Sequence, residues 1–191
     1  MVQPNKKRKP KGPSKSTGKA PVIRMATDAD VDAILAIWLD MMRYHHNLDN
    51  RHWNLAPGGG EKFAAWMRGS VGAEDKVLLV AETDGDVVGF LHGIFKESPK
   101  VVVPRKSGYI TDAAVMESHR RGGLGKLLLA AAEEWYSEHG ADDIYLAAAV
   151  RNDIGLGFWT SQGFESITVS MWKPVKAPKP PAKPAVRRRQ K

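Results

Sequence analysis

The stretch Arg120-Arg121-Gly122-Gly123-Leu124-Gly125-Lys126 joins a predicted strand, which ends at Val115, to a predicted apolar helix. Glycines at such a junction let the backbone turn sharply and approach a ligand closely. The helix that follows offers unpaired backbone N–H groups and the positive end of its dipole. Together with the cationic side chains of Arg120, Arg121 and Lys126, these groups predict a site for a pyrophosphate.

Two other phosphate-binding loops do not fit this stretch. A Walker loop requires Ser or Thr after its lysine and a glycine earlier, but Leu127 follows Lys126 and Arg120 occupies the glycine position. A dinucleotide fingerprint requires a third glycine where Leu128 stands. The glycines alone are explained equally well by an anion site and by a plain turn.

The rest of the chain alternates between short apolar runs and helical patterns. Strands are expected over 22–25, 77–82, 87–95, 108–115, 144–150 and 164–172, and helices over 27–44, 61–68, 123–139 and from 152 onward. Asp84-Gly85 is typical of a hairpin turn, so the strands over 77–95 predict a meander. The later strand–helix–strand unit implies parallel neighbours. The expected fold class is α/β, a mixed (α+β) sheet flanked by helices.

Length and composition are those of one globular domain. The chain has 191 residues, of which 42% are hydrophobic and 26% charged. It has no cysteine, which excludes disulfides, thiolate metal sites and a cysteine nucleophile. No apolar run approaches the roughly 20 residues that span a bilayer, and no apolar stretch follows the basic N-terminus as in a secretory signal. We therefore expect no membrane partner and a cytoplasmic location.

The net charge of +8 is divided unevenly along the chain. Residues 1–20 carry seven Lys and Arg, residues 173–191 carry eight, and neither stretch has an acid, so residues 21–172 hold 14 basic and 21 acidic residues. We expect a single acidic domain over 21–173 between disordered tails at 1–20 and 174–191. The tails could bind nucleic acid weakly and without sequence preference, but without aromatic side chains they would not stack on bases.

A second motif lies downstream of the glycine-rich stretch. Asn152 is followed at fixed spacing by Phe158-Trp159 and by Gly163-Phe164. This block is similar to the Asn…(Leu/Phe)-Tyr-x-x-x-Gly-Phe segment of the GCN5-related N-acetyltransferase (GNAT) family. Arg120-x-x-Gly123-x-Gly125 resembles the acyl-CoA signature of that family, Arg/Gln-x-x-Gly-x-Gly/Ala. The resemblance covers about 21–173, and the order of the elements also fits.

The resemblance implies a partly splayed sheet that binds acetyl-CoA without a metal. Pantetheine would lie where the strands 108–115 and 144–150 separate, and Asn152 would sit near it or simply cap the next helix. Backbone groups of Ala113, Ala114 and Val115 would bind pantetheine and the thioester carbonyl. The pyrophosphate would be held by the loop amides and by Arg120, the loop residues being Arg121, Gly122, Gly123, Leu124, Gly125 and Lys126.

The family's reaction is direct attack by an amine on the thioester, and this sequence departs from its usual acid and base. Trp159 occupies the position where the family often places an acidic Tyr, and an indole N–H is no acid at neutral pH. The thiolate would leave unassisted, another group would serve, or the protein would not catalyse. The family's Glu would fall at Tyr109 or Thr111, so Asp112 is the nearest acid on that strand and our candidate base or ammonium ligand.

Other candidates are weaker. Glu82, His92 and Tyr109 lie on predicted strands, and Glu82 ends its strand and would simply face water. Three histidines, at 45, 46 and 52, lack carboxylates at ligand spacing, so no metal site is expected. The segment 45–53 is a candidate for part of the acceptor pocket, because the family's first loop and helix usually form it.

We therefore expect an acetyl-CoA-dependent N-acetyltransferase, a monomer or a homodimer. A cationic small-molecule amine suits the acidic domain as the acceptor, and a protein lysine or N-terminus is the next candidate. Two alternatives remain: a non-catalytic acetyl-CoA-binding module, and a nucleic-acid-associated protein that acts through its basic tails.

Overall fold

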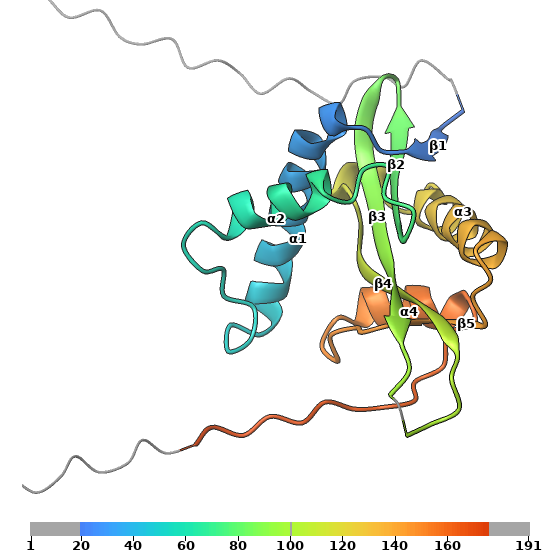
Figure 1. Cartoon of the computed structure of the whole chain (residues 1–191). Helices are drawn as coiled ribbons and strands as arrows, with labels where there is room; N and C mark the ends of the chain where they lie inside the picture. Colours follow the sequence, from blue (N-terminus) through green and yellow to red (C-terminus); the bar gives the residue numbers. More distant parts are fainter. Residues whose placement is uncertain (1–19, 100, 176–191) are drawn as a thin grey trace, which may run out of the picture.

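A five-stranded sheet forms the centre of the molecule (Figure 1), seen in a computed structural model that describes residues 20–99 and 101–175. Its strands follow the chain order: β1 (Val22–Met25), β2 (Lys76–Thr83), β3 (Asp86–Glu97), β4 (Lys106–Val115) and β5 (Asp143–Leu146). The first four pair antiparallel, and β5 runs parallel to β4. The mixed α/β fold is confirmed, while nearly all of both predicted tails lies outside the described residues.

Helices cover both faces of the sheet. Helices α1 (Val31–Leu48) and α2 (Gly59–Arg68) pack on one face, and α3 (Leu124–Glu138) packs on the other (Figure 1). Helix α4 (Asp153–Ser161) follows β5, and short 3₁₀ turns precede α1 (Asp28–Asp30) and follow β4 (Glu117–His119). None of the described helices is long and apolar enough to cross a bilayer.

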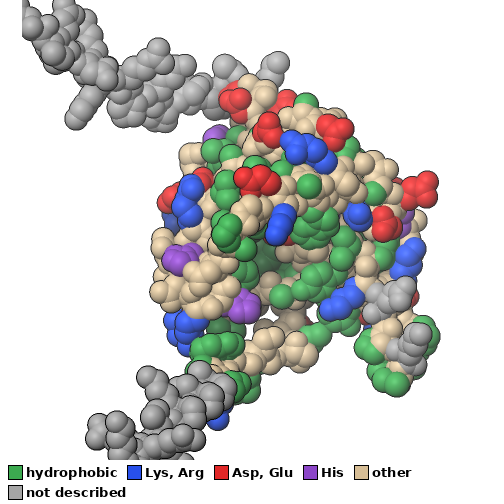
Figure 2. All heavy atoms as spheres, turned by 60° about the vertical axis from the view of Figure 1, so that its left-hand side comes forward, with side chains coloured by type: hydrophobic (Ala, Val, Ile, Leu, Met, Phe, Trp, Pro, Cys, Tyr) green, Lys and Arg blue, Asp and Glu red, His purple; other side chains and the backbone are tan. Residues whose placement is uncertain are grey.

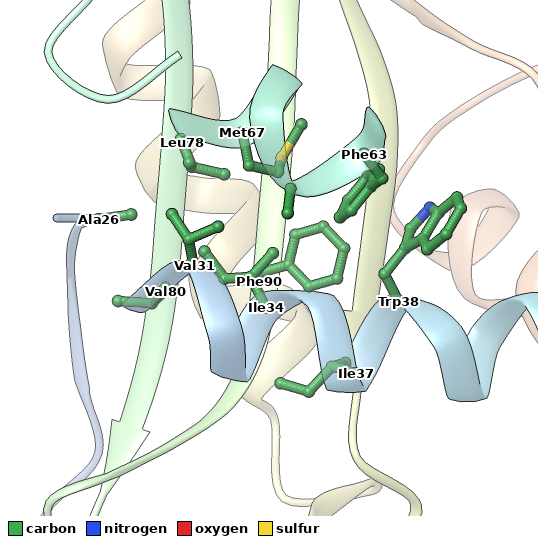
Figure 3. Close-up of a cluster of buried hydrophobic side chains, with 11 residues drawn as sticks. Ala26, Val31, Ile34, Ile37, Trp38, Phe63, Met67, Leu78, Val80 and Phe90 are labelled. Atoms are coloured by element: carbon green, nitrogen blue, oxygen red, sulfur yellow. The ribbon is translucent and has the colours of Figure 1, made fainter. Parts of the chain in front are cut away.

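The apolar core lies in two layers. Figure 3 shows the layer between α1, α2 and the sheet, where Phe90 of β3 meets Ile34 and Phe63, and Phe63 stacks on Trp38 at a ring-centroid distance of 4.0 Å. The second layer joins α3 to the opposite face through Leu128 and neighbouring side chains. These layers fix α1 and β4, the two elements that carry the candidate acceptor site, against each other.

The sheet opens between β4 and β5, as expected. Pairing runs only from Ser107 opposite Asp143 to Ile110 opposite Leu146. Strand β4 continues five residues further to Val115 and keeps β3 as its partner. The register between β3 and β4 shifts at Thr111, since Asp112 lies opposite His92 whereas Ile110 lies opposite Gly93. Such a bulge increases the local twist of a strand and re-aims the side chains that follow it.

The predicted strand over 164–172 is wrong for this structure. Residues 164–175 form no helix or strand, and all from 165 onward are exposed. The predicted strand over 144–150 is also too long, because β5 ends at Leu146. Both errors have one physical cause: apolar alternation predicts that a segment can be a strand, but a strand forms only where a neighbour offers its backbone.

Candidate active site

The glycine-rich stretch forms a left-handed turn into α3. Arg121 has a φ of +64° and Gly123, the N-cap of α3, has a φ of +81°. The Leu127 N–H donates to the Gly123 carbonyl at 3.1 Å, so the N–H groups of the first helical residues have no partner within the helix. The first turn carries no acidic side chain. This arrangement of amides and basic residues fits an anionic group such as a pyrophosphate.

Two contacts tie this loop to the rest of the site. The Arg120 Nε–H donates to the Val115 carbonyl at 3.0 Å, which holds the loop against the end of β4. A Cβ built on Gly125 would lie 3.3 Å from the Phe158 ring, so glycine lets α4 approach the start of α3 closely. Structure therefore brings together the two sequence motifs, which are about 30 residues apart.

The free part of β4 forms the wall between this loop and the acceptor side. Ala113, Ala114 and Val115 lie beyond the last residue that pairs with β5, and all three are half-buried. Along an antiparallel strand, backbone N–H and C=O groups point alternately to one neighbour and to the other. Every second backbone unit of this segment therefore points into the opening, where a thioester and its pantetheine arm could bond to it.

Asp112 lies where β4 passes α1. Its Oδ1 accepts a hydrogen bond of 3.0 Å from Trp38 Nε1. Burial raises the pKa of the Asp112 carboxyl above its usual value, and the hydrogen bonds from Thr111 and Trp38 and the nearby His45 oppose that rise. A carboxylate whose pKa is raised by burial can accept a hydrogen bond from an ammonium ion or take up a proton.

His45 of α1 is the second titratable group beside this carboxylate. Burial lowers the pKa of His45 below 6.5, so its ring is neutral at pH 7, and the Asp112 charge partly offsets that effect. Its Nδ1 is buried, and the Met41 backbone opposes the effect of burial on the pKa. Its ring stacks on Trp53 at a centroid distance of 4.8 Å, which places the loop after α1 over it. A neutral imidazole beside a carboxylate can act as a proton acceptor.

Asn152 links this group to α4. Its Oδ1 accepts the Gly155 N–H at 2.9 Å as the N-cap of α4, which confirms the expected cap. The same residue lies 3.3 Å from His45 Nε2 and accepts a 3.4 Å hydrogen bond from the Tyr44 hydroxyl. Residues from α1, β4 and α4 thus surround one region, and Figure 2 shows a hollow lined by apolar side chains, with histidines near it, on this side of the molecule.

The sequence did not link His45, Trp38 and Tyr44 to Asp112. Trp38 and His45 are seven residues apart and lie on one face of α1, so a helical periodicity plot extended past residue 44 could have placed both toward the sheet. The contact with β4 itself is a long-range feature that local patterns do not contain.

The remaining candidates have other surroundings. Trp159 packs edge-on against Phe158 and Phe164, at centroid distances of 4.8 and 5.4 Å, and belongs to the core layer of α3. Tyr109 lies in the part of β4 that still pairs with β5, and the Lys96 ammonium is 4.8 Å from its ring centroid.

Two weaker candidates serve the structure. Glu82 accepts hydrogen bonds of 2.9 and 3.1 Å from Arg24, which also binds Asp30. His92 is fully buried between Thr111 and Ser70, and burial together with the Lys76 charge lowers its pKa to about 4. Among the described residues, no group of three or more His, Asp or Glu is placed to hold a metal ion.

Comparisons with known proteins identify the family and the fold. Residues 36–164 match the model of the Acetyltransferase (GNAT) family. An N-alpha-acetyltransferase from Sulfurisphaera tokodaii is 31% identical over 103 residues, which make up 50% of this chain and 60% of that protein. The chain thus matches less than two thirds of the length of this relative.

Solved structures share the fold. The mutant BH1408 protein from Bacillus halodurans has a TM-score of 0.74 at 22% identity, over 81% of this chain and 99% of that one. The aminoglycoside N-acetyltransferase AAC(6')-Iy in complex with CoA has a TM-score of 0.63 at 17% identity, over 87% and 99%.

Proposed function

This chain belongs to the GNAT acetyltransferase family, and we propose that it transfers the acetyl group of acetyl-CoA directly to a primary amine. One observation carries the proposal. The phosphate-type loop, the free segment of β4 and the partly buried Asp112 carboxylate follow one another along the opening beside β4. An anionic cofactor bound at the loop end of that opening would place its thioester next to Asp112, which can bind an amine, at the other end.

The residues present fit acetyl-CoA as the acetyl donor. The left-handed turn at Gly123 and the first amides of α3 offer the pyrophosphate donors in a fixed orientation, and Arg121 and Lys126 add positive charge. Arg120 is held against Val115 and supports the loop. Backbone groups of Ala113, Ala114 and Val115 would bond the pantetheine amides and the thioester carbonyl, and their N–H groups would stabilise the negative charge that develops on its oxygen.

The reaction requires no covalent enzyme intermediate. The amine nitrogen forms a bond to the carbonyl carbon, the carbon–sulfur bond breaks, one amine proton leaves, and the products are the acetylated amine and the CoA thiol. An alkylammonium has a pKa near 10, so a bound acceptor must first lose a proton. Once the nitrogen bonds to carbon its remaining protons become far more acidic, and a weak base then suffices.

Asp112 and His45 have separate roles toward the acceptor amine. The Asp112 carboxylate binds the ammonium form and increases its local concentration. The neutral His45 ring accepts the proton directly or through a water molecule. Trp38, through its hydrogen bond, holds the carboxylate in place, and Asn152 holds the His45 ring from α4.

Trp159 acts in packing and not in proton transfer. Its ring is enclosed by Phe158 and Phe164, so it fixes α4 against the core. The CoA thiol has a pKa near 8.5, low enough for the thiolate to leave without a general acid and to take its proton from solvent.

The acceptor we favour is a small amine with more than one positive charge. Residues 21–172 carry seven more acidic than basic residues, and a negative potential concentrates cations. A protein N-terminus is the second candidate, because the relative from Sulfurisphaera tokodaii is an N-alpha-acetyltransferase.

The test is thiol release from acetyl-CoA in the presence of different amines. The chain has no cysteine, so a thiol reagent reports only the CoA product. The panel contains polyamines and aminoglycosides, short peptides with free N-termini, and matched peptides with blocked N-termini and a free lysine. We expect turnover with one of these classes.

Two results of this test contradict the proposal. Binding of acetyl-CoA without turnover on any amine identifies a non-catalytic acetyl-CoA-binding module. Salt-sensitive DNA binding that disappears when 1–20 and 174–191 are deleted, without acetyl transfer, supports a role in nucleic-acid association instead.

A further inference from the structure

Residues 164–175, here called the C-terminal arm, expose an unusual amount of apolar surface. Ile167, Val169 and Met171 are 67%, 73% and 93% exposed, and Trp172 is 60% exposed. The first three alternate with Ser166, Thr168 and Ser170. Alternation with period two is the pattern of a strand that buries one face, and a monomer rarely leaves such a face open to water.

A second segment that lacks a strand partner lies at the edge of the sheet. Strand β5 is the last strand in the sheet order, and among the described residues its outer edge has no neighbour. The residues after it, Ala147-Ala148-Ala149-Val150, continue its apolar character but form no strand, and Val150 is 70% exposed. This edge, 143–150, presents backbone donors and acceptors that another strand can use.

The arm does not run along its own β5 in Figure 1. Gly163 has a φ of +89°, and the Phe164 N–H donates to the Trp159 carbonyl at 3.1 Å, which closes the end of the helix. Beyond it the arm runs beneath the body toward the loop after α1 (Figure 1), where the Arg51 guanidinium lies 5.4 Å from the Trp172 ring centroid. An extended segment held on such a course is poised to pair outside its own chain.

We infer that the arm is exchanged between two copies of this chain, and that each arm adds a strand to the β5 edge of the other copy. Strand addition supplies main-chain hydrogen bonds along the edge and covers the alternating apolar side chains. The exchange is reciprocal about a two-fold axis, so the assembly closes as a dimer. Residues 147–150, which face no strand in the single chain, then become part of a longer β5.

The size of the contact is sufficient for a stable dimer. Nine residues of strand span about 30 Å, enough to follow the whole edge. Two arms with three alternating apolar side chains each, together with the paired backbone, bury on the order of 1,000 Å², the area that a specific interface needs. The inference is independent of the proposed acetyl transfer, since it uses no residue of the candidate active site.

The first measurement is the mass of the full chain in solution by light scattering. We expect two chains of 21.0 kDa each. Val169→Pro removes a backbone donor from the middle of the arm and should yield the monomer. Ser170→Ala, on the opposite face of the arm, is the matched control and should leave the dimer intact. A monomeric wild type, or a Val169→Pro variant that remains dimeric, overturns the inference.

The second measurement identifies which β5 the arm meets. Because the chain has no cysteine, Thr168→Cys and Ala147→Cys each introduce a unique thiol, and both positions are exposed. The two single variants are co-expressed and treated with a short bis-maleimide. Because each chain has one thiol, exchange predicts a cross-link from position 168 of one chain to position 147 of another.

The double variant, Thr168→Cys with Ala147→Cys in one chain, distinguishes the alternatives. If it cross-links only within a chain while the single variants do not cross-link, the arm pairs with its own β5 and the exchange is wrong. If neither preparation cross-links, the arm is not a strand of this sheet and the inference also fails. Thermal unfolding of each variant verifies that the domain is folded.

Discussion

Replacing Asp112 with Asn separates the chemical role of this carboxylate from its structural role. An Asn side chain keeps the shape and the oxygen that accepts the 3.0 Å hydrogen bond from Trp38 Nε1, but it loses the negative charge and cannot accept a proton. A hydrogen bond to a charged group contributes about 1.5–3 kcal/mol. Because Asp112→Asn removes the charge that binds the ammonium, we expect kcat/KM for the amine to fall by roughly 10- to 150-fold.

The same substitution should not destabilise the fold. The pKa of Asp112 is raised by burial, so the folded state binds the proton more tightly than the unfolded state does. Stability is then lost as pH rises from 3.8 through the raised pKa of the folded state, and at neutral pH the ionised carboxylate lowers the free energy of unfolding. Asn removes that cost, and we expect a Tm equal to or above that of the wild type.

Asp112→Ala provides the contrast. It leaves the indole N–H of Trp38, which is 9% exposed, without a partner, at a cost of about 1–3 kcal/mol. In a domain of this size the Tm should fall by roughly 2–12 °C. Asp112→Asn and Asp112→Ala should therefore lose similar activity while their Tm values move apart.

The assay is steady-state thiol release between pH 6 and 9, with thermal unfolding of the same preparations. Asp32→Asn is the matched control, since its side chain is 88% exposed on the same helix that carries Trp38. If Asp112→Asn keeps the kcat/KM of the wild type over this pH range, the carboxylate has no part in the reaction and the reasoning is refuted.

Three further outcomes are expected. Gly123→Ala places a Cβ at a φ of +81° with open space around it, so its cost of about 1–2 kcal/mol is conformational and not steric. We expect weaker acetyl-CoA binding by calorimetry. An unchanged Kd contradicts the assignment of this loop to the pyrophosphate. Asn152→Ala removes a helix cap and should lower the free energy of unfolding by about 1 kcal/mol, measured with urea. It should also raise KM for the amine. If stability falls and KM does not change, Asn152 acts only as a cap. His92, with a pKa of about 4 when folded and 6.5 when unfolded, contributes stability above pH 6.5 that is lost toward pH 4, roughly 3 kcal/mol; His92→Gln should flatten this dependence, and an unchanged pH dependence contradicts this role of His92.

The parts of the structure that depend on local chemistry could be predicted from the sequence. Gly123 allowed a left-handed N-cap, Asn152 was a good cap, and Asp84-Gly85 was a hairpin turn, and each of these has that conformation here. The bounds of most elements are correct within a few residues for the same reason, since apolar periodicity is a property of neighbouring positions.

Features that depend on distant contacts could not be predicted in this way. His45 and Asp112 are 67 positions apart and meet only because α1 packs against β4 and the bulge at Thr111 re-aims the strand. The C-terminal arm has the alternation of a strand, yet its partner is not encoded in its own residues, so the predicted pairing within the chain is absent among the described residues. Both cases are decided by tertiary and quaternary packing.

Direct transfer of an acetyl group at the Asp112 site fixes the stoichiometry of the reaction, which can be measured. Thiol released from acetyl-CoA and N-acetylated amine formed, the latter by mass spectrometry, are measured in the same samples of wild type and Asp112→Asn. We expect one acetylated amine per thiol, with both falling together in Asp112→Asn. Thiol release without acetylated amine, or equal yields and rates from both proteins, would contradict direct transfer at this site.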